Sequence, residues 1–135
     1  MAIVIDSSIA VCWGTPDEVS SLADMALTIA GEEGMQVPAL FWHELANVML
    51  VNERRGRITP ELSRKAIQLV EKMLPSTDKI IDTGAILALG RQHGLSAYDA
   101  AYLELAKRIG APLATLDRKL AQAAEAEGVP VNPAA

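Results

Sequence analysis

Short apolar runs alternate with longer amphipathic segments along this chain, and this alternation narrows the possible folds more than any other feature. The first run, residues 2–5, is apolar and β-branched and ends at a turn-compatible Asp-Ser-Ser, which is typical of a buried parallel strand. Strands that alternate with helices favour an α/β fold, with helices on both faces of a parallel sheet. The 135 residues, 50% of them apolar, suffice for one such domain. We therefore expect residues 1–135 to form a single α/β domain.

Prolines, glycines and capping residues set the boundaries of the expected elements. Strands are predicted at residues 2–5, 35–37, 79–81 and 112–114, with a last extended piece around 129–131. Helices are predicted from a capping box at 15–18 to the 31–34 region, from 39 to about 55, from 60 until Pro75 stops it, and at 83–93, 96–109 and 118–127. Ligands of open parallel sheets bind beyond the carboxyl ends of the strands, so the residues that follow each strand are the first candidates for a site.

Four acidic side chains occupy positions that suggest a common purpose. Asp6 directly follows the first strand and Asp117 comes shortly after the fourth, so both can reach one edge of the sheet. Glu44 and Asp99 lie on the apolar stripes of their helices, where an unpaired charge is costly. No basic residue accompanies them there at a fixed helical offset. Gathered carboxylates repel one another unless a divalent ion joins them, and an all-oxygen set suits Mg²⁺ or Mn²⁺. This chemistry favours metal-assisted hydrolysis of a phosphodiester.

Each acid, taken singly, also has a simpler interpretation. Asp6, Asp99 and Asp117 stand at or near helix starts, where aspartate caps free backbone N–H groups. Glu44 lies in the middle of a helix, where no free N–H group needs a cap, but it could pair with an arginine from elsewhere in the chain. The coincidence of all four acids is what favours a shared site.

Four segments that contain these acids also resemble, in order and spacing, the signature blocks of a known family. They are residues 3–8 (IVIDSS), 38–47 (PALFWHELAN), 95–103 (LSAYDAAYL) and 113–120 (LATLDRKL). Together they resemble PIN-domain ribonucleases, specifically the VapC-type toxins of bacterial toxin-antitoxin pairs, over nearly the whole chain. The resemblance implies a PIN-like three-layer α/β/α fold, with a short, mainly parallel central sheet covered by helices on both faces.

The same resemblance implies an endoribonuclease that depends on Mg²⁺ or Mn²⁺ and hydrolyses RNA with metal-activated water. Asp6, Glu44, Asp99 and Asp117 would hold the metal, and Thr115 matches the catalytic hydroxyl residue of the family beside the last acid. A homodimer and a VapB-type antitoxin that covers the acidic pocket are the implied partners. A PIN-fold RNA-processing nuclease outside a toxin-antitoxin pair is the alternative that the resemblance leaves open.

A basic cluster, Arg54, Arg55 and Arg57, comes at the end of the Glu44 helix. These arginines could guide an RNA backbone, or simply complement the negative end of the helix. Arg118, directly after Asp117, has the same two interpretations, contact with RNA phosphate or a solvated helix start.

Composition bears on the compartment and on the partner. The 17 acidic residues outnumber the 12 basic ones, which gives a net charge of -5 and speaks against a broadly basic nucleic-acid platform. Without the four candidate ligands the balance is 13 to 12, so the excess belongs mostly to one pocket. The single Cys12 cannot form an internal disulfide, and the first residues lack the basic start of a signal peptide. We therefore expect a cytoplasmic protein without a membrane span.

Three other classes of protein also use acidic residues in an α/β fold or an acidic pocket. A phospho-accepting receiver domain needs an acid pair after the first strand, and an acyl-phosphate-forming phosphatase needs Asp-x-Asp. Ser7 and Ser8 follow Asp6 instead, so neither pattern is met. A non-catalytic protein whose acidic pocket binds the arginines of a partner remains a third possibility.

Overall fold

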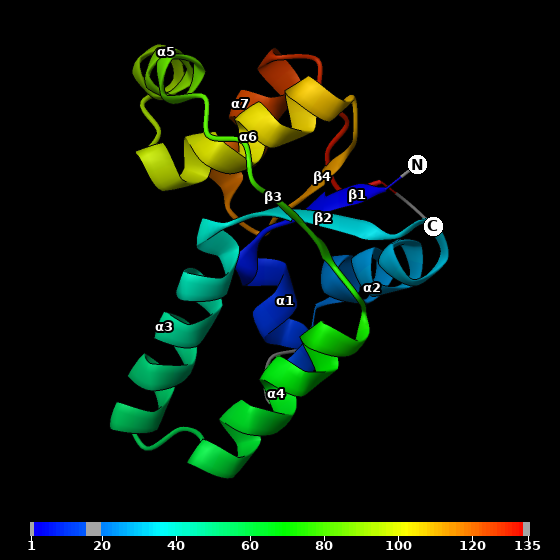
Figure 1. Ribbon diagram of the computed structural model, residues 1–135, viewed down its shortest axis with the longest axis vertical. Coiled ribbons are helices and arrows are strands. Elements are labelled where there is room, and N and C mark those ends of the chain that lie inside the picture. Colours follow the sequence, from blue (N-terminus) through cyan, green and yellow to red (C-terminus); the bar gives the residue numbers. More distant parts are fainter. Residues whose placement is uncertain (1, 16–19, 134–135) are drawn as a thin grey trace.

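A parallel sheet of four short strands forms the centre of the molecule (Figure 1). The computed structural model describes residues 2–15 and 20–133. The strands are β1 (Ile3–Ile5), β2 (Met35–Pro38), β3 (Ser76–Asp78) and β4 (Leu113–Ala114), in the order β3-β2-β1-β4. Every neighbouring pair is parallel, and the three β1 residues are fully buried, as suits a central strand. The predicted short parallel sheet is confirmed.

Helices cover both faces of this sheet and complete a three-layer α/β/α fold (Figure 1). On one side lie α1 (Ser7–Gly14), α2 (Ser21–Glu33), α3 (Leu40–Arg54) and α4 (Pro60–Lys72). On the other lie α5 (Thr83–His93), α6 (Ala97–Ile109) and α7 (Arg118–Ala126). The α6 helix packs against β1, β2 and β4, and its middle is buried from residue 100 to residue 106. None of the helices in the described part of the chain is long and apolar enough to cross a membrane.

Local capping explains why most predicted helix boundaries agree with the structure. Thr59 accepts a hydrogen bond from the Leu62 N–H at 3.2 Å, and Pro60 begins α4. Gly94 and Gly110 end α5 and α6 with φ of 64° and 66°, the left-handed conformation that glycine adopts without strain. The start predicted at 15–18, for the helix that was expected to run to the 31–34 region, falls, from residue 16 on, outside the described residues. The described helix begins at Ser21.

The α1 helix occupies residues 7–14, where the sequence suggested only a turn after the first strand. Asp6 accepts a hydrogen bond from the Ile9 N–H at 3.3 Å and so caps this helix. An Asp-Ser-Ser segment suits a turn and a helix start equally, because both use the side-chain oxygen as a local acceptor. The helix has a consequence for the site, because it fixes Ser7 and Ser8 beside the end of β1.

The third strand was predicted at residues 79–81, and this prediction is wrong. The strand is Ser76–Asp78, which pairs in parallel with Gln36–Pro38 of β2. The strand lies at the edge of the sheet and consists of polar residues, so it lacks the apolar run by which a buried strand is recognised in a sequence. Ile80 and Ile81, which suggested a strand, are instead 61% and 73% exposed in the connection to α5.

Candidate active site at the carboxyl edge of the sheet

The ends of β1 and β4 bring Asp6 and Thr115 together. The two strands are in register, with Ile5 opposite Ala114, so the next residue of each strand reaches the same edge. The Asp6 carboxylate is 5% exposed. Its Oδ2 accepts a short hydrogen bond from Thr115 Oγ1, and its Oδ1 accepts one from Ser8 Oγ at 2.5 Å. Two hydroxyl groups and the Ile9 N–H therefore fix the orientation of this carboxylate.

Burial governs the electrostatics of Asp6. It raises the pKa of the carboxyl to about 6, even though the hydrogen bonds from Ser8, Thr115 and Ile9 act in the opposite direction. The negative charge of Asp99 adds to the rise in the pKa. A nearby cation would therefore stabilise the ionised form of this buried carboxylate.

Glu44 lies in the second turn of α3, half-buried, and makes hydrogen bonds to both layers of helices. The Tyr102 hydroxyl of α6 donates to Glu44 Oε1 at 2.6 Å, and Ser7 Oγ of α1 donates to the same oxygen at 3.4 Å. Burial, and then the contact with Glu44, hold the pKa of the Tyr102 phenol far above its usual range, so the phenol stays a neutral donor.

No ion pair joins Glu44 to the basic cluster, or to any other described residue. The salt bridge considered for Glu44 is therefore not formed.

Asp99 and Asp117 lie at the starts of α6 and α7. The Asp99 carboxyl is half-buried, and its pKa is raised first by burial and then by the charge of Asp117. The cap of α6 is Ser96, whose Oγ accepts the Asp99 N–H at 3.1 Å. Asp117 is exposed and caps α7, with Oδ1 accepting the Leu120 N–H at 2.9 Å. The capping interpretation is thus confirmed for Asp6 and Asp117, whereas α6 takes its cap from Ser96.

The four acids influence one another electrostatically, one after the next, but they do not surround a single point as the ligands of a bound metal would. The charge of Asp6 acts on Tyr102, the partner of Glu44; Asp99 raises the pKa of Asp6; and Asp117 raises that of Asp99. Among the described residues, no three Asp, Glu, His or Cys side chains stand close enough to hold a metal together. Nor does any described lysine or arginine form an ion pair with one of the four. Lys119 offsets part of the charge of Asp99 without forming an ion pair with it. Oxygen donors that repel one another and have no directly paired cation fit a divalent ion chemically, and the ion would supply further positive charge.

Three further residues hold the site together, and the sequence analysis did not assign them this role. Ser8 Oγ also accepts the Leu116 N–H at 3.0 Å, which ties the start of α1 to the segment after β4. Asn132 exchanges two hydrogen bonds with the Thr115 backbone, at 2.9 and 3.0 Å. Tyr102 lies three residues after Asp99, a spacing that places both side chains on the same face of α6. No spacing signal marked Asn132, because its contact depends on the parallel bridge between Val131 and Leu113.

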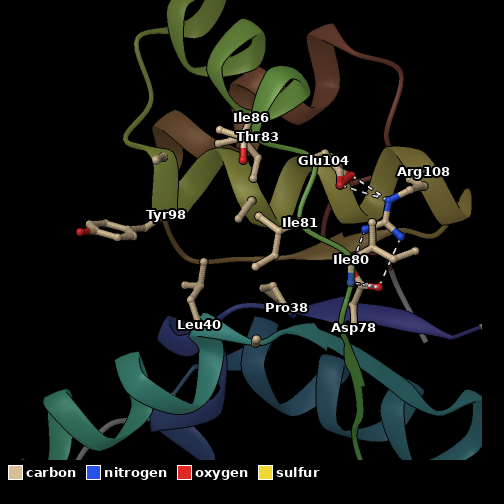
Figure 2. Close-up of a pocket in the computed structure, with 13 residues that line it drawn as sticks. Pro38, Leu40, Asp78, Ile80, Ile81, Thr83, Ile86, Tyr98, Glu104 and Arg108 are labelled. Atoms are coloured by element: carbon tan, nitrogen blue, oxygen red, sulfur yellow. Dashed lines mark hydrogen bonds and ion pairs between the residues drawn. The ribbon is translucent and has the colours of Figure 1, made fainter.

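A separate cavity of about 270 Å³ lies between β2, α6 and the connection from β3 to α5, and none of the four acids lines it (Figure 2). Arg108 crosses its wall and pairs with Glu104 at 3.0 Å and with Asp78 at 2.5 Å. The rest of the lining is largely apolar and includes Ile81 and Ile86. Because the charged groups of this cavity are already paired, it offers no chemistry for phosphodiester hydrolysis.

A three-layer α/β/α fold with acidic side chains at the carboxyl edge of a parallel sheet is the arrangement that the four sequence blocks led us to expect. The family model of the PIN domain matches residues 3–126. The chain therefore belongs to the PIN-domain family, as the four sequence blocks predicted.

One curated relative places the chain more closely within the family, and one solved structure bears on its fold. It is 32% identical over 126 residues to Ribonuclease VapC3 of Pyrobaculum aerophilum, a match that covers 90% of this chain and 94% of the relative. The chain is accordingly a VapC-type member of the family. The crystal structure of PAE2754 from Pyrobaculum aerophilum superposes with a TM-score of 0.76 and 20% identity, over 98% of this chain and 90% of that one. This likeness confirms the fold.

Proposed function

We propose that this VapC-type PIN domain is a metal-dependent endoribonuclease that hydrolyses phosphodiester bonds in RNA. The observation that carries the proposal is the series of four carboxylates at the carboxyl edge of the sheet, with no cation paired to them among the described residues. The ribonuclease named among its relatives supports the same activity.

Asp6, Glu44, Asp99 and Asp117 are the residues proposed to hold Mg²⁺ or Mn²⁺. When bound, such an ion lowers the pKa of water and polarises a phosphoryl oxygen. The protein contributes orientation, because Thr115 and Ser8 hold the Asp6 carboxylate by its two oxygens, and Tyr102 holds that of Glu44. The orientation of these two carboxylates is therefore fixed before a cation binds, which lowers part of the entropic cost of binding, although the four acids would have to draw closer together to share the ion.

Replacing Tyr102 by phenylalanine is expected to lower the cleavage rate about tenfold and the free energy of unfolding by about 1–2 kcal/mol. The ring still fills its buried place, but Glu44 keeps only the long contact from Ser7. Steady-state cleavage and urea unfolding measure the two effects. Tyr98→Phe is the matched control, because that tyrosine is 64% exposed. Equal kcat values for the two variants would show that Tyr102 only fills space.

The direct test of the activity is the chemistry of the RNA ends. Purified protein is incubated with single-stranded RNA and Mg²⁺, and the new termini are mapped. Attack by water leaves no 2′,3′-cyclic phosphate, whereas attack by the 2′-hydroxyl of the RNA itself leaves one. Cyclic ends, or no cleavage at all, would contradict the proposal.

A VapB-type antitoxin is proposed as the partner that neutralises the enzyme, in the cytoplasm. The acidic edge would attract an arginine-bearing segment, because the protein has a net charge of -5. The alternative is an RNA-processing nuclease outside a toxin-antitoxin pair. A small adjacent gene for a DNA-binding protein that abolishes cleavage when added would favour the toxin, and its absence would favour the alternative.

A homodimer is part of the proposal, and the exposed apolar side chains around the cavity of Figure 2 support it. Ile81 is 73% exposed there, beside Ile80 and Tyr98. Ile81→Lys is expected to convert a dimer into a monomer in light scattering, because a charge on an apolar contact is costly. Leu50→Lys, on the exposed side of α3, is the matched control and should leave the dimer intact. A parent protein that is already monomeric would disprove the dimer.

A further inference from the structure

A groove of about 400 Å³ runs between α1 and α3, next to the acidic site. Its rim carries Ser7 and Ser8 from α1 and Asn47, Asn52 and Arg55 from α3, over a floor of three valines. The volume is in the range of small-ligand pockets, and the polar groups stand around an apolar centre.

The groove is continuous with the site at one end. Ser7 and Ser8, which line it, are the residues that donate hydrogen bonds to Glu44 and Asp6. Along α3, Asn47, Asn52 and Arg55 follow Glu44 by three, eight and eleven residues. Arg55 therefore lies on the stripe of Glu44, about 20° away around the helix axis, and Asn47 and Asn52 flank this stripe by about 60° and 80° on its two sides. Eleven residues of helix rise about 16 Å. A chain that starts at the acids can therefore follow this stripe as far as Arg55.

Electrostatics distinguish the groove from the rest of the protein. The net charge of the chain is -5, yet no acidic residue lines the groove, and its one charged residue is Arg55. Asn52 is only 6% exposed, and its side-chain amide makes no hydrogen bond to any other residue in the described part of the chain. Although the residue is largely buried, its amide atoms reach the solvent in the groove, where a ligand or water can form hydrogen bonds to them. The groove thus presents a cation and free amides beside a site that repels anions.

We propose that this groove binds the RNA strand next to the cleaved bond, with Arg55 on a backbone phosphate and Asn47 and Asn52 on the sugar-phosphate groups between. Amides and hydroxyls suit ribose and phosphate oxygens, and the arginine suits a phosphate. The inference rests on the proposed ribonuclease function and adds substrate-positioning residues to it. Of the basic cluster, it assigns the RNA contact to Arg55 alone.

The first test compares Arg55→Ala with Arg57→Ala, which removes the same charge two residues away and outside the groove. Arg55→Ala is expected to raise the KM for a mixed-sequence single-stranded RNA about tenfold, with little change in kcat. It should also lower the salt slope of RNA binding by about 0.7, the value for one phosphate contact on a single strand. Binding is measured by fluorescence anisotropy in the Asp6→Asn background, so that the RNA stays intact. Arg57→Ala should match the parent.

The second test adds charge instead of removing it. Asn47 and Ala46 are both exposed on α3, but only Asn47 lines the groove. Asn47→Glu should weaken RNA binding by tenfold or more, and Ala46→Glu should have a far smaller effect.

Three results would overturn the inference, and they differ in meaning. If the parent cleaves RNA and the groove variants behave like their controls, the groove is not the RNA path, while the ribonuclease function stands. If the groove variants cleave normally but escape neutralisation by the antitoxin, the groove belongs to a protein partner. If the parent neither binds nor cleaves RNA, the proposed function itself has failed.

Discussion

Asp6→Asn should abolish RNA cleavage, by a factor of at least about 10³, and yet stabilise the protein when no divalent ion is present. The two effects have one origin. Asp6 is proposed to hold the metal, and its carboxylate is buried beside Asp99 with no cation to offset the charge. An asparagine keeps the size of the side chain and its acceptor oxygen for the Ile9 N–H.

The pH dependence of stability gives the sign of this effect. Burial raises the pKa of Asp6 from 3.8 to about 6, so the folded state binds the proton more tightly than the unfolded state. The metal-free parent therefore loses stability as the pH rises from about 4 through 6, by up to roughly 3 kcal/mol. Asp6→Asn has no such loss. Thermal unfolding in chelator should show the variant above the parent near neutral pH and close to it at about pH 4.

The control for this experiment is Glu71→Gln, which removes an exposed acid of α4 without a described partner. It should leave both cleavage and stability near those of the parent. Cleavage by Asp6→Asn at the rate of the parent in Mg²⁺ would refute the assignment of Asp6 to the metal. A variant that is much less stable than the parent at neutral pH would show that the hydrogen bonds of the carboxylate outweigh its burial.

The sheet edge could be predicted because it depends on local rules. Residues that follow parallel neighbouring strands in register must reach the same side, and Asp6 and Thr115 do so. The caps of α4, α5 and α6 were equally predictable, because Thr59, Gly94 and Ser96 act within a few residues of themselves. By contrast, the edge strand β3 is polar and depends on pairing with β2, which no local pattern encodes.

Contacts between distant segments escaped prediction for a different reason. The hydrogen bond from Tyr102 to Glu44 joins residues 58 positions apart, and that from Asn132 to Thr115 depends on where the last extended segment lies. For Asp117, the observed role as a helix cap does not rule out the proposed role as a metal ligand. Asp117 uses Oδ1 on the Leu120 N–H, and its other oxygen has no hydrogen bond within the described residues. One carboxylate can therefore cap a helix and still offer an oxygen to a ligand.

Removal of divalent ions is expected to reduce cleavage to the level of the uncatalysed reaction, and addition of Mg²⁺ or Mn²⁺ should restore it fully. The acids of the site lack a paired cation among the described residues, so bound metal should also raise the melting temperature in proportion to the logarithm of its concentration. Protons compete with the metal for Asp6, whose pKa is about 6. The rise in melting temperature should therefore be larger at about pH 8 than at about pH 5.

Two variants separate a metal effect from a general effect of salt. Asp6→Asn should lose most of the rise in melting temperature on adding Mg²⁺, whereas Glu71→Gln should retain it, because only the first removes a proposed ligand. A charge-screening effect would act on both proteins alike, since both lose one negative charge. Turnover that persists in excess chelator would instead require the protein's own groups to activate water. The buried phenol of Tyr102 is poorly suited to this, because its raised pKa keeps it protonated and hydrogen-bonded to Glu44.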